Sequence, residues 1–131
     1  MYTFGDDKEV HIFDIKSRSH ESVHKFHDHG CLSGYSIAIS NNNQYLATGC
    51  KSGIVNIYNV NDTFKTNKPK PIKSLMNLTT PCTQLKFNCN GEILATCSSH
   101  AENALKLVNY FHYVLCPKEN KFMRIFLLVY H

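Results

Sequence analysis

The chain contains a unit of about 45 to 50 residues that recurs with the same internal design. Segments 40–50 and 88–98 align without a gap, and both contain the tripeptide Leu-Ala-Thr, which begins at Leu46 in one and at Leu94 in the other. In each copy an alternating apolar stretch precedes an Asn- or Gly-rich turn, and a second apolar stretch follows it, which predicts a β-hairpin. A repeat of this length constrains the fold more than any single motif does, because one supersecondary unit must be used several times.

A further alternating strand follows each predicted hairpin, and a third copy of that strand lies near the start of the chain. The three copies are residues 9–14, 54–59 and 104–109. Val10 and Ile12 flank His11 in the first copy, and Val, Ile or Leu flank Asn56 and Lys106 in the others. None of these segments has apolar residues at helical spacing over a dozen positions, so the pattern favours strands over a helical solenoid.

Repeats of this length made of short strands are typical of β-propeller blades. The sequence therefore predicts an all-β fold, a partial β-propeller of antiparallel strands with about two and a half blades, whereas closed rings have about 4 to 8. Met1 aligns with Leu46 in mid-strand, so we expect the chain to begin inside a blade. A ring that is not closed should expose unpaired strand edges.

The repeating unit resembles the WD40 repeat, in which the third strand ends in an aromatic residue and an Asp. The corresponding pairs are Phe13-Asp14, Tyr58-Asn59 and Val108-Asn109. Only the first pair keeps the acid, no copy has Trp, and no Gly-His dipeptide precedes a strand. These departures argue against the side-chain hydrogen-bond network that locks a typical WD40 blade, although they leave the strand pattern intact.

Several longer segments resemble one particular family, the U3 small nucleolar RNA-associated WD40 proteins of the small-subunit processome. The similar segments are 1–7, 28–34, 52–58 and, above all, the linker-like stretch 69–80. Lys8 stands where the family has Gly. The resemblance ends near Val108, so we divide the chain into partial WD40 blades over 1–109 and a divergent tail over 110–131.

The resemblance implies a non-catalytic scaffold that acts in nucleolar pre-rRNA processing and small ribosomal subunit biogenesis. It also implies a location in the nucleus and nucleolus, and partners among other processome proteins within a U3 ribonucleoprotein assembly. A generic WD40 adaptor in another complex, such as a ubiquitin ligase or a chromatin assembly, is the alternative. A thiol or metal hydrolase ranks third. We expect no enzyme activity, no cofactor and no small-molecule substrate.

The basic residues are only slightly in excess, with 14 Lys and Arg against 10 Asp and Glu, so charge alone does not predict nucleic-acid binding. One basic cluster stands out, consisting of Lys65, Lys68, Lys70 and Lys73. If pre-rRNA is contacted directly, these lysines are the residues we expect to meet phosphate. Phe64 is the only aromatic residue near them that could stack on a base, so a solubilising loop is the alternative.

The cysteine and histidine residues do not form a recognisable site in the sequence. The first residues lack a secretory signal, so the six cysteines are expected to be free thiols, packed as small apolar side chains where they lie in the repeat. One segment gathers His20, His24, His27, His29 and Cys31. It has no Cys-x-x-Cys pair and lacks a complete set of zinc ligands, so we expect a solvated connection between blades and no metal.

Two further classes of function find no support in the sequence. The glycines are too dispersed for a phosphate-binding loop. The longest apolar run, residues 125–130, is far shorter than the roughly 20 residues needed to span a bilayer, so no membrane span is expected.

Overall fold

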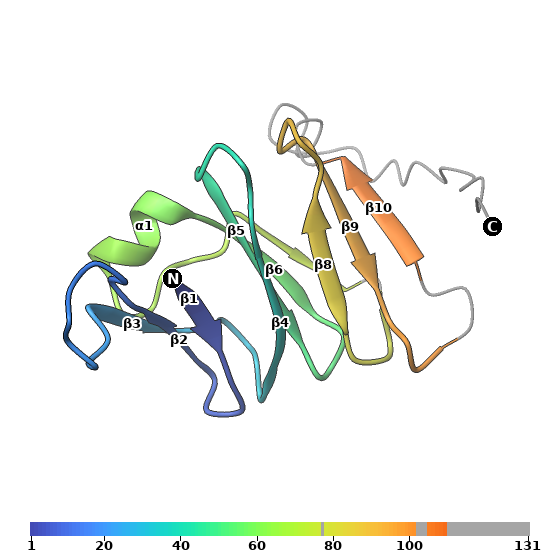
Figure 1. Ribbon diagram of the computed structural model, residues 1–131. Helices are drawn as coiled ribbons and strands as arrows, with labels where there is room; N and C mark the ends of the chain where they lie inside the picture. Colours follow the sequence, from blue (N-terminus) through green and yellow to red (C-terminus); the bar gives the residue numbers. More distant parts are fainter. Residues whose placement is uncertain (77, 102–104, 110–131) are drawn as a thin grey trace.

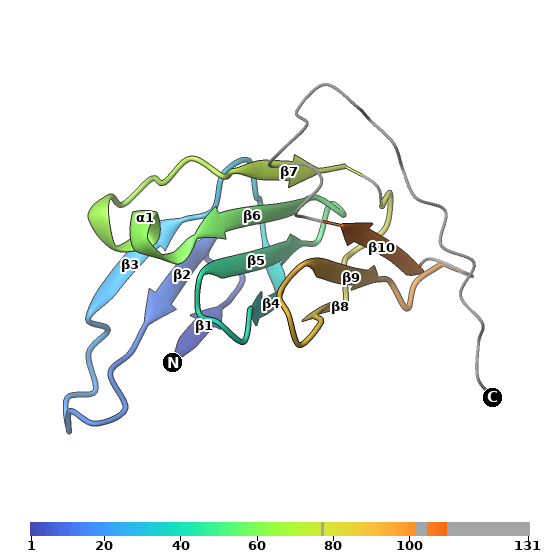
Figure 2. The same ribbon diagram turned by 90° about the horizontal axis from the view of Figure 1, so that it is seen from above.

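The computed structural model describes residues 1–76, 78–101 and 105–109, which form three antiparallel sheets arranged one beside the next (Figures 1 and 2). The first sheet has the order β1 (Tyr2–Phe4), β2 (Glu9–Ile12), β3 (His24–His27). The middle sheet has the order β4 (Gly34–Ile39), β5 (Tyr45–Cys50), β6 (Val55–Asn59), β7 (Lys73–Leu75). The third sheet consists of β8 (Gln84–Phe87), β9 (Ile93–Cys97) and β10 (Leu105–Asn109).

The strands of the three sheets pair in equivalent registers. Leu46 on β5 lies opposite Tyr58 on β6, and Leu94 on β9 lies opposite Val108 on β10. In the first sheet Phe4 pairs with Val10, as Gly49 pairs with Val55 in the middle sheet. The predicted all-β fold of successive blades is therefore confirmed, and the three described sheets do not close into a ring.

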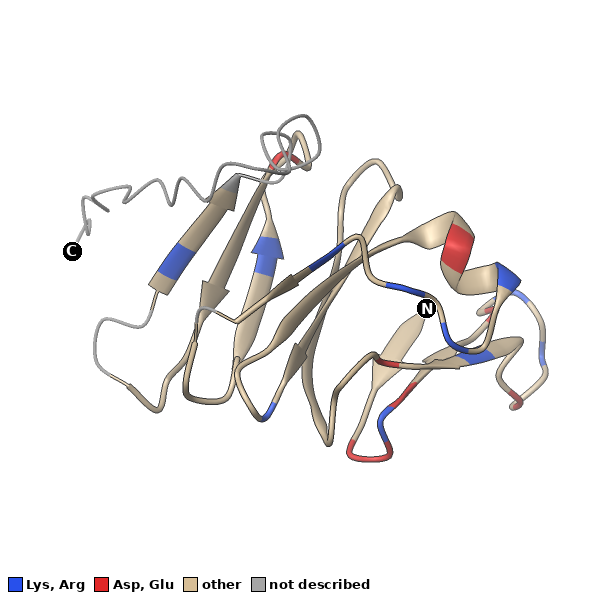
Figure 3. Ribbon diagram, turned by 180° about the vertical axis from the view of Figure 1, so that it is seen from behind, with Lys and Arg blue, Asp and Glu red and all other residues tan. Residues whose placement is uncertain are grey.

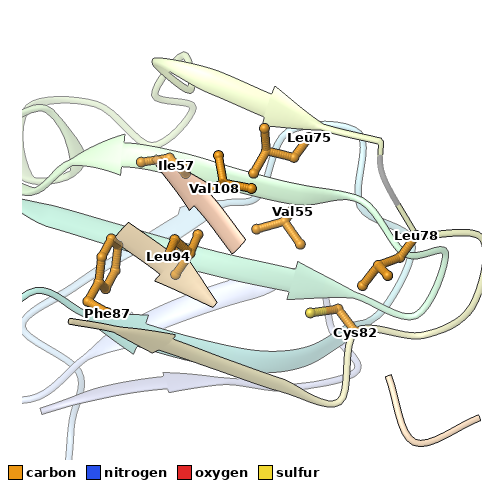
Figure 4. Close-up of a cluster of buried hydrophobic side chains, with 9 residues drawn as sticks. Val55, Ile57, Leu75, Leu78, Cys82, Phe87, Leu94 and Val108 are labelled. Atoms are coloured by element: carbon orange, nitrogen blue, oxygen red, sulfur yellow. The ribbon is translucent and has the colours of Figure 1, made fainter. Parts of the chain in front are cut away.

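Two apolar cores hold the three sheets together. The first lies between the first and middle sheets and consists of Val10, Ile12, Phe26, Leu46, Tyr58 and Val60. The second core joins the middle and third sheets, where Val55, Ile57 and Leu75 meet Leu94 and Val108 (Figure 4). Because alternate residues of a strand face opposite sides, β5 and β6 contribute to both cores.

The two outer faces of the described sheets differ in character. Glu9 and His11 on β2 alternate with the buried Val10 and Ile12, so they lie on the face of the first sheet that points away from the middle sheet. The corresponding face of the third sheet is apolar on β9 and β10, while β8 adds Gln84 and Lys86 opposite Cys97 and Ala95. The apolar part carries Ile93, Ala95, Cys97, Leu105 and Leu107. No described residue covers that apolar face, and Leu105 remains 41% exposed.

Three elements were not predicted from the sequence. The His-rich segment contains β3, whose Phe26 is buried in the first core, so the prediction that it is only a solvated connection is wrong for residues 24–27. The linker-like stretch 69–80 contains β7 and buries Leu75 and Leu78. The short helix α1 (Val60–Lys65) follows β6 and begins where the Asn59 side chain accepts a hydrogen bond from the amide of Asn61.

The sequence divides the chain into blades and a tail, and part of that division falls on residues outside those described. The predicted tail over 110–131 lies there, as do Asn77 and residues 102–104. Within the described part, no helix has the length and apolar character needed to cross a membrane.

Candidate functional site

The buried carboxylate of Asp28 organises the contact between the first and middle sheets. Asp28 follows β3 and is only 5% exposed. Its Oδ1 accepts hydrogen bonds from Thr48 Oγ1 at 2.8 Å, from Asn56 Nδ2 at 3.0 Å and from the Tyr58 hydroxyl at 2.5 Å. The three donors come from β5 and β6 and are themselves fully buried. One carboxylate thus ties the connection after β3 to two strands of the next sheet.

The network extends beyond Asp28 in two directions. The amide of His29 donates to the Tyr58 hydroxyl at 2.8 Å, and Asn56 Nδ2 also donates to the carbonyl of His29 at 2.8 Å. On the other side Ser74 Oγ donates to Asn56 Oδ1 at 2.7 Å, which brings in β7. A chain of hydrogen bonds therefore runs from the loop after β3 across the middle sheet. We call Asp28, Thr48, Asn56, Tyr58 and Ser74 the Asp28 network.

The electrostatics of the Asp28 network follow from its burial. Desolvation raises the pKa of the Asp28 carboxyl above its ordinary value, while the hydrogen bonds from Tyr58, Thr48 and Asn56 oppose that rise. The pKa of Tyr58 is also raised, first by burial and then by the adjacent Asp28 charge. Tyr58 therefore stays a hydrogen-bond donor over the whole physiological pH range. Such a buried, satisfied cluster fixes one arrangement of the two sheets.

The same loop is attached to β5 by a covalent bond. Cys31 and Cys50 form a disulfide with a Cα–Cα distance of 5.9 Å, and both residues are buried. Cys50 Sγ also lies 3.2 Å from Asp28 Oδ2. The sequence-based expectation that all six cysteines are free thiols is wrong for this pair, because folding brings together two residues 19 positions apart.

The Asp28 network corrects the expectation that this chain lacks a WD40-type side-chain network. The usual Trp and Gly-His are absent, yet Tyr58 supplies an aromatic residue with a hydroxyl, and Asp28 supplies the central acceptor. Sequence reasoning missed this arrangement because it looked for the usual residue types. The available signal was Asp28 ahead of β4, together with Tyr58 as the aromatic residue next to the end of segment 54–59.

The four predicted RNA-contacting lysines lie along one continuous stretch at the outer side of the middle sheet. Figure 3 shows blue segments from the end of α1 to β7. Lys65 ends α1 and pairs with Asp62 at 3.2 Å, Lys68 and Lys70 are exposed, and Lys73 begins β7 and is half-buried. The backbone of this stretch is attached to β3, since the amide of His27 donates to the carbonyl of Asn67 at 2.9 Å. The lysines therefore form an ordered edge whose contact with RNA stays a prediction.

Thiol chemistry has no activated nucleophile among the described free cysteines. Burial raises the pKa of the Cys82 thiol, which is the opposite of what a catalytic cysteine needs. Cys89 is exposed and its sulfur lies 3.5 Å from the Asn90 side chain. Cys97 is partly buried on β9. Cys116 lies outside the described residues.

The structure disperses most of the His/Cys segment that was considered for metal binding. His20 and His29 are exposed. His24 and His27 lie at the two ends of β3, and Cys31 is in the disulfide. The five residues do not come together in one site. His27 instead approaches Glu9 of β2, with its Nε2 3.4 Å from Glu9 Oε1.

Comparison with known proteins agrees with the geometry. Residues 20–59 match the family "WD domain, G-beta repeat". This matched range contains the Asp28 network except for Ser74. A chain in a solved structure described as "Crystal Structure of Mitotic Checkpoint Complex" superposes with a TM-score of 0.68 and covers 84% of this chain and 32% of that one. At 14% sequence identity, that similarity concerns the fold alone.

Curated relatives are much closer in sequence. The mouse "U3 small nucleolar RNA-associated protein 18 homolog" is 46% identical over 109 residues, which is 83% of this chain and 19% of the mouse protein. The human protein of the same name is 44% identical over the same coverage. The Drosophila melanogaster homolog is 42% identical over 106 residues, 81% of this chain and 21% of its own length. The chain thus spans about a fifth of the length of these relatives.

Proposed function

Since this chain belongs to the WD40-repeat proteins and is homologous to the U3 small nucleolar RNA-associated protein 18 homologs, we propose that it serves as part of a non-catalytic scaffold in nucleolar ribosome biogenesis. The scaffold would act in pre-rRNA processing and in maturation of the small ribosomal subunit. Its partners would be other processome proteins in a U3 ribonucleoprotein assembly. The identity over 83% of the chain is the observation that carries the proposal.

The structure supports a scaffold role through its polar core. A surface that binds neighbouring proteins must keep its shape, and adjacent blades keep theirs when the contact between them is fixed. Here the Asp28 network and the core around Phe26 and Leu46 fix the first sheet against the middle one.

The proposed nuclear location agrees with how the loop after β3 is held. Disulfides are rare in nuclear proteins, because the compartment keeps thiols reduced. In the nucleus the loop after β3 would therefore not depend on the Cys31–Cys50 disulfide for its attachment. The hydrogen bonds of Asp28 and His29 to β5 and β6 hold the same loop without any covalent bond. The fold can keep this contact in a reducing compartment.

Direct contact with pre-rRNA would use the ordered lysine edge. Lys68 and Lys70 extend from a stretch that is anchored to β3 at Asn67 and to β6 through the β7 pairing. An anchored cationic edge loses less conformational freedom on binding phosphate than a free loop does. Lys65 and Lys73 extend the edge at its two ends.

A chimera tests the function in the context of a complete relative. Residues 1–109 of this chain would replace the homologous 109 residues of the human protein, in cells depleted of the endogenous copy. We expect the chimera to restore pre-rRNA processing and to sediment with large pre-ribosomal particles on gradients. A matched chimera with Asp28→Leu, which removes the central acceptor, should restore both readouts poorly.

The outcomes separate the proposal from its alternative. If the intact chimera is stable in the nucleus yet remains at the top of the gradient without precursor rRNA, the processome assignment is wrong. In that case a WD40 adaptor of another complex takes its place. Protein levels of both chimeras, measured by quantitative blotting, distinguish loss of function from loss of the protein.

A further inference from the structure

The outer face of the first sheet gathers four side chains with metal-binding atoms from three separate segments. Asp7 lies in the turn after β1, Glu9 and His11 lie on β2, and His27 ends β3. His11 Nε2 lies 2.9 Å from Asp7 Oδ2 and 3.8 Å from Glu9 Oε2. His27 Nε2 lies 3.4 Å from the other Glu9 oxygen, Oε1. The Glu9 carboxylate thus lies between the two imidazoles.

The strand register explains why these side chains meet. Glu9 on β2 is directly opposite His27 on β3, and His11 is directly opposite Lys25. Residues opposite one another on adjacent antiparallel strands project from the same face. Asp7 reaches the same face from the turn, where its Oδ1 also accepts a hydrogen bond from the amide of Glu9. The positions of Asp7 and Glu9 are therefore set by the backbone.

We propose that Asp7, Glu9, His11 and His27 form a binding site for a zinc-class divalent cation. With metal–ligand bonds of about 2.0–2.1 Å, two ligands of a tetrahedral zinc ion lie roughly 3.3 Å apart. The separations of 2.9, 3.4 and 3.8 Å bracket that value. The ligand atoms of Asp7, Glu9 and His11 all lie within 4.8 Å of one another. Small side-chain rotations would bring these three residues to bonding distance of a single ion, and the His27 ring, which approaches Glu9 Oε1, would have to turn towards them to supply the fourth ligand.

The donor types select the class of cation. Two imidazoles with two carboxylates suit zinc and its neighbours copper and nickel, whereas magnesium and calcium prefer oxygen ligands alone. The site is open to solvent at Asp7 and His27, both about half exposed, so an ion can enter without opening the fold. The inference is independent of the proposed scaffold function, because it concerns a face that the Asp28 network does not use.

The positive charge of Lys25 already pairs with the Glu9 carboxylate of the proposed site, which allows a direct test. Its Nζ lies 3.2 Å from Glu9 Oε2, and the side chain is 58% exposed. A cation at the site must displace this ammonium group or accept its repulsion. Removing the Lys25 charge should therefore strengthen metal binding, while removing a ligand should weaken it. Stronger zinc binding on removal of the Lys25 charge and weaker binding on removal of the nearby His27 ring cannot both come from unfolding, because both side chains are exposed.

The experiment is a titration of the purified full chain with zinc chloride, followed by calorimetry and by the NMR signals of the imidazole rings. We expect His11→Ala and His27→Ala each to weaken zinc binding by at least about 10-fold, since even outer-shell partners contribute that much. Lys25→Gln should tighten it. His20→Ala, which removes an exposed histidine away from the site, is the matched control and should change nothing.

Specific outcomes would overturn the proposal. One is zinc binding that persists unchanged in the His11→Ala and His27→Ala variants, which would place the ion elsewhere on the chain. Another is the absence of zinc-dependent shifts in the His11 and His27 ring signals of the unmodified chain. A third is magnesium binding of equal strength. Backbone amide spectra of each variant check that the first sheet is still formed.

Discussion

The Tyr58 hydroxyl on β6 donates a 2.5 Å hydrogen bond to Oδ1 of Asp28, although Asp28 lies 30 positions earlier in the chain, in the loop that follows β3. Tyr58 also packs edge-on against Phe26, with ring centroids 5.5 Å apart. One side chain therefore takes part in both the polar network and the apolar core of the same contact. Changes at this position separate the two contributions.

Replacing Tyr58 by Phe keeps the ring and removes the hydroxyl. Asp28 then loses one of three donors to Oδ1, and the amide of His29 loses its acceptor. We expect the free energy of unfolding to fall by about 1–3 kcal/mol, the usual cost of leaving buried polar groups unpaired. Denaturant titration followed by fluorescence measures it. Tyr35→Phe, at a tyrosine that is 44% exposed, is the control and should have almost no effect.

Asp28 should make stability depend on pH. Its carboxyl has a raised pKa in the folded state, so the folded chain holds the proton to a higher pH than the unfolded chain does. The stabilisation that this proton gives is complete below the unfolded pKa and is lost as pH rises through the folded pKa. Asp28→Asn cannot titrate, so its stability should not show this decline.

The measurement is the free energy of unfolding of both proteins at a series of acidic to neutral pH values. We expect the unmodified chain to lose stability relative to Asp28→Asn as pH rises above the ordinary range for Asp. Two parallel profiles would mean that the hydrogen bonds from Tyr58, Thr48 and Asn56 cancel the effect of burial on the pKa.

Gly53 should tolerate a side chain less well than Gly30 does. Both have a positive φ, +87° and +68°, so alanine at either position adopts a disfavoured backbone conformation that costs about 1 kcal/mol. A Cβ at Gly53 would also meet the Leu78 carbonyl, whereas a Cβ at Gly30 would meet nothing within 4 Å. Gly53→Ala should therefore cost at least about 1 kcal/mol more. Equal losses of stability in thermal unfolding would contradict the close approach of Leu78.

The apolar outer face of the third sheet should cause self-association of the isolated chain. Leu105 and Leu107 lie on this face beside Ala95 and Cys97, their cross-strand neighbours. We expect light scattering to show oligomers of the purified chain, and Leu105→Glu with Leu107→Thr to shift the distribution towards monomer. Ile15→Glu changes an exposed apolar residue outside this face and should leave the distribution unchanged. A monomeric unmodified chain would refute this prediction.

The lysine edge predicts salt-dependent RNA binding. Changing Lys65, Lys68 and Lys70 to Ala should weaken binding of a single-stranded pre-rRNA segment and lower the slope of log affinity against log salt by about 2, at roughly 0.7 per phosphate contact. Changing Lys16, Lys51 and Lys86 to Ala removes the same charge elsewhere. Filter binding at several salt concentrations compares them. Equal effects would show that net charge alone attracts the RNA.

The local elements of the fold could be predicted where residue pattern and pairing agree. Alternation of residue types in β2, β6 and β10, and the Leu-Ala-Thr shared by β5 and β9, predicted strands and hairpins, because successive side chains of a strand face opposite sides of the sheet. The strand β3 escaped prediction because three of its four residues, His24, Lys25 and His27, are polar. Phe26 alone is apolar and buried, and a single apolar residue shows no alternation. The strand β7 has only three residues, too few to show a period.

The sequence by itself determined the repeat, the all-β fold and the family resemblance, since these depend on residue order along the chain. Only the tertiary structure decided which distant side chains meet. Asp28 reaches Thr48, Asn56 and Tyr58 because the first sheet packs on the middle one. Asp7 and His27 reach Glu9 and His11 because of strand pairing and turn geometry. Hydrogen bonds and metal ligation depend on distances of about 2–3 Å in space, which chain spacing alone does not fix.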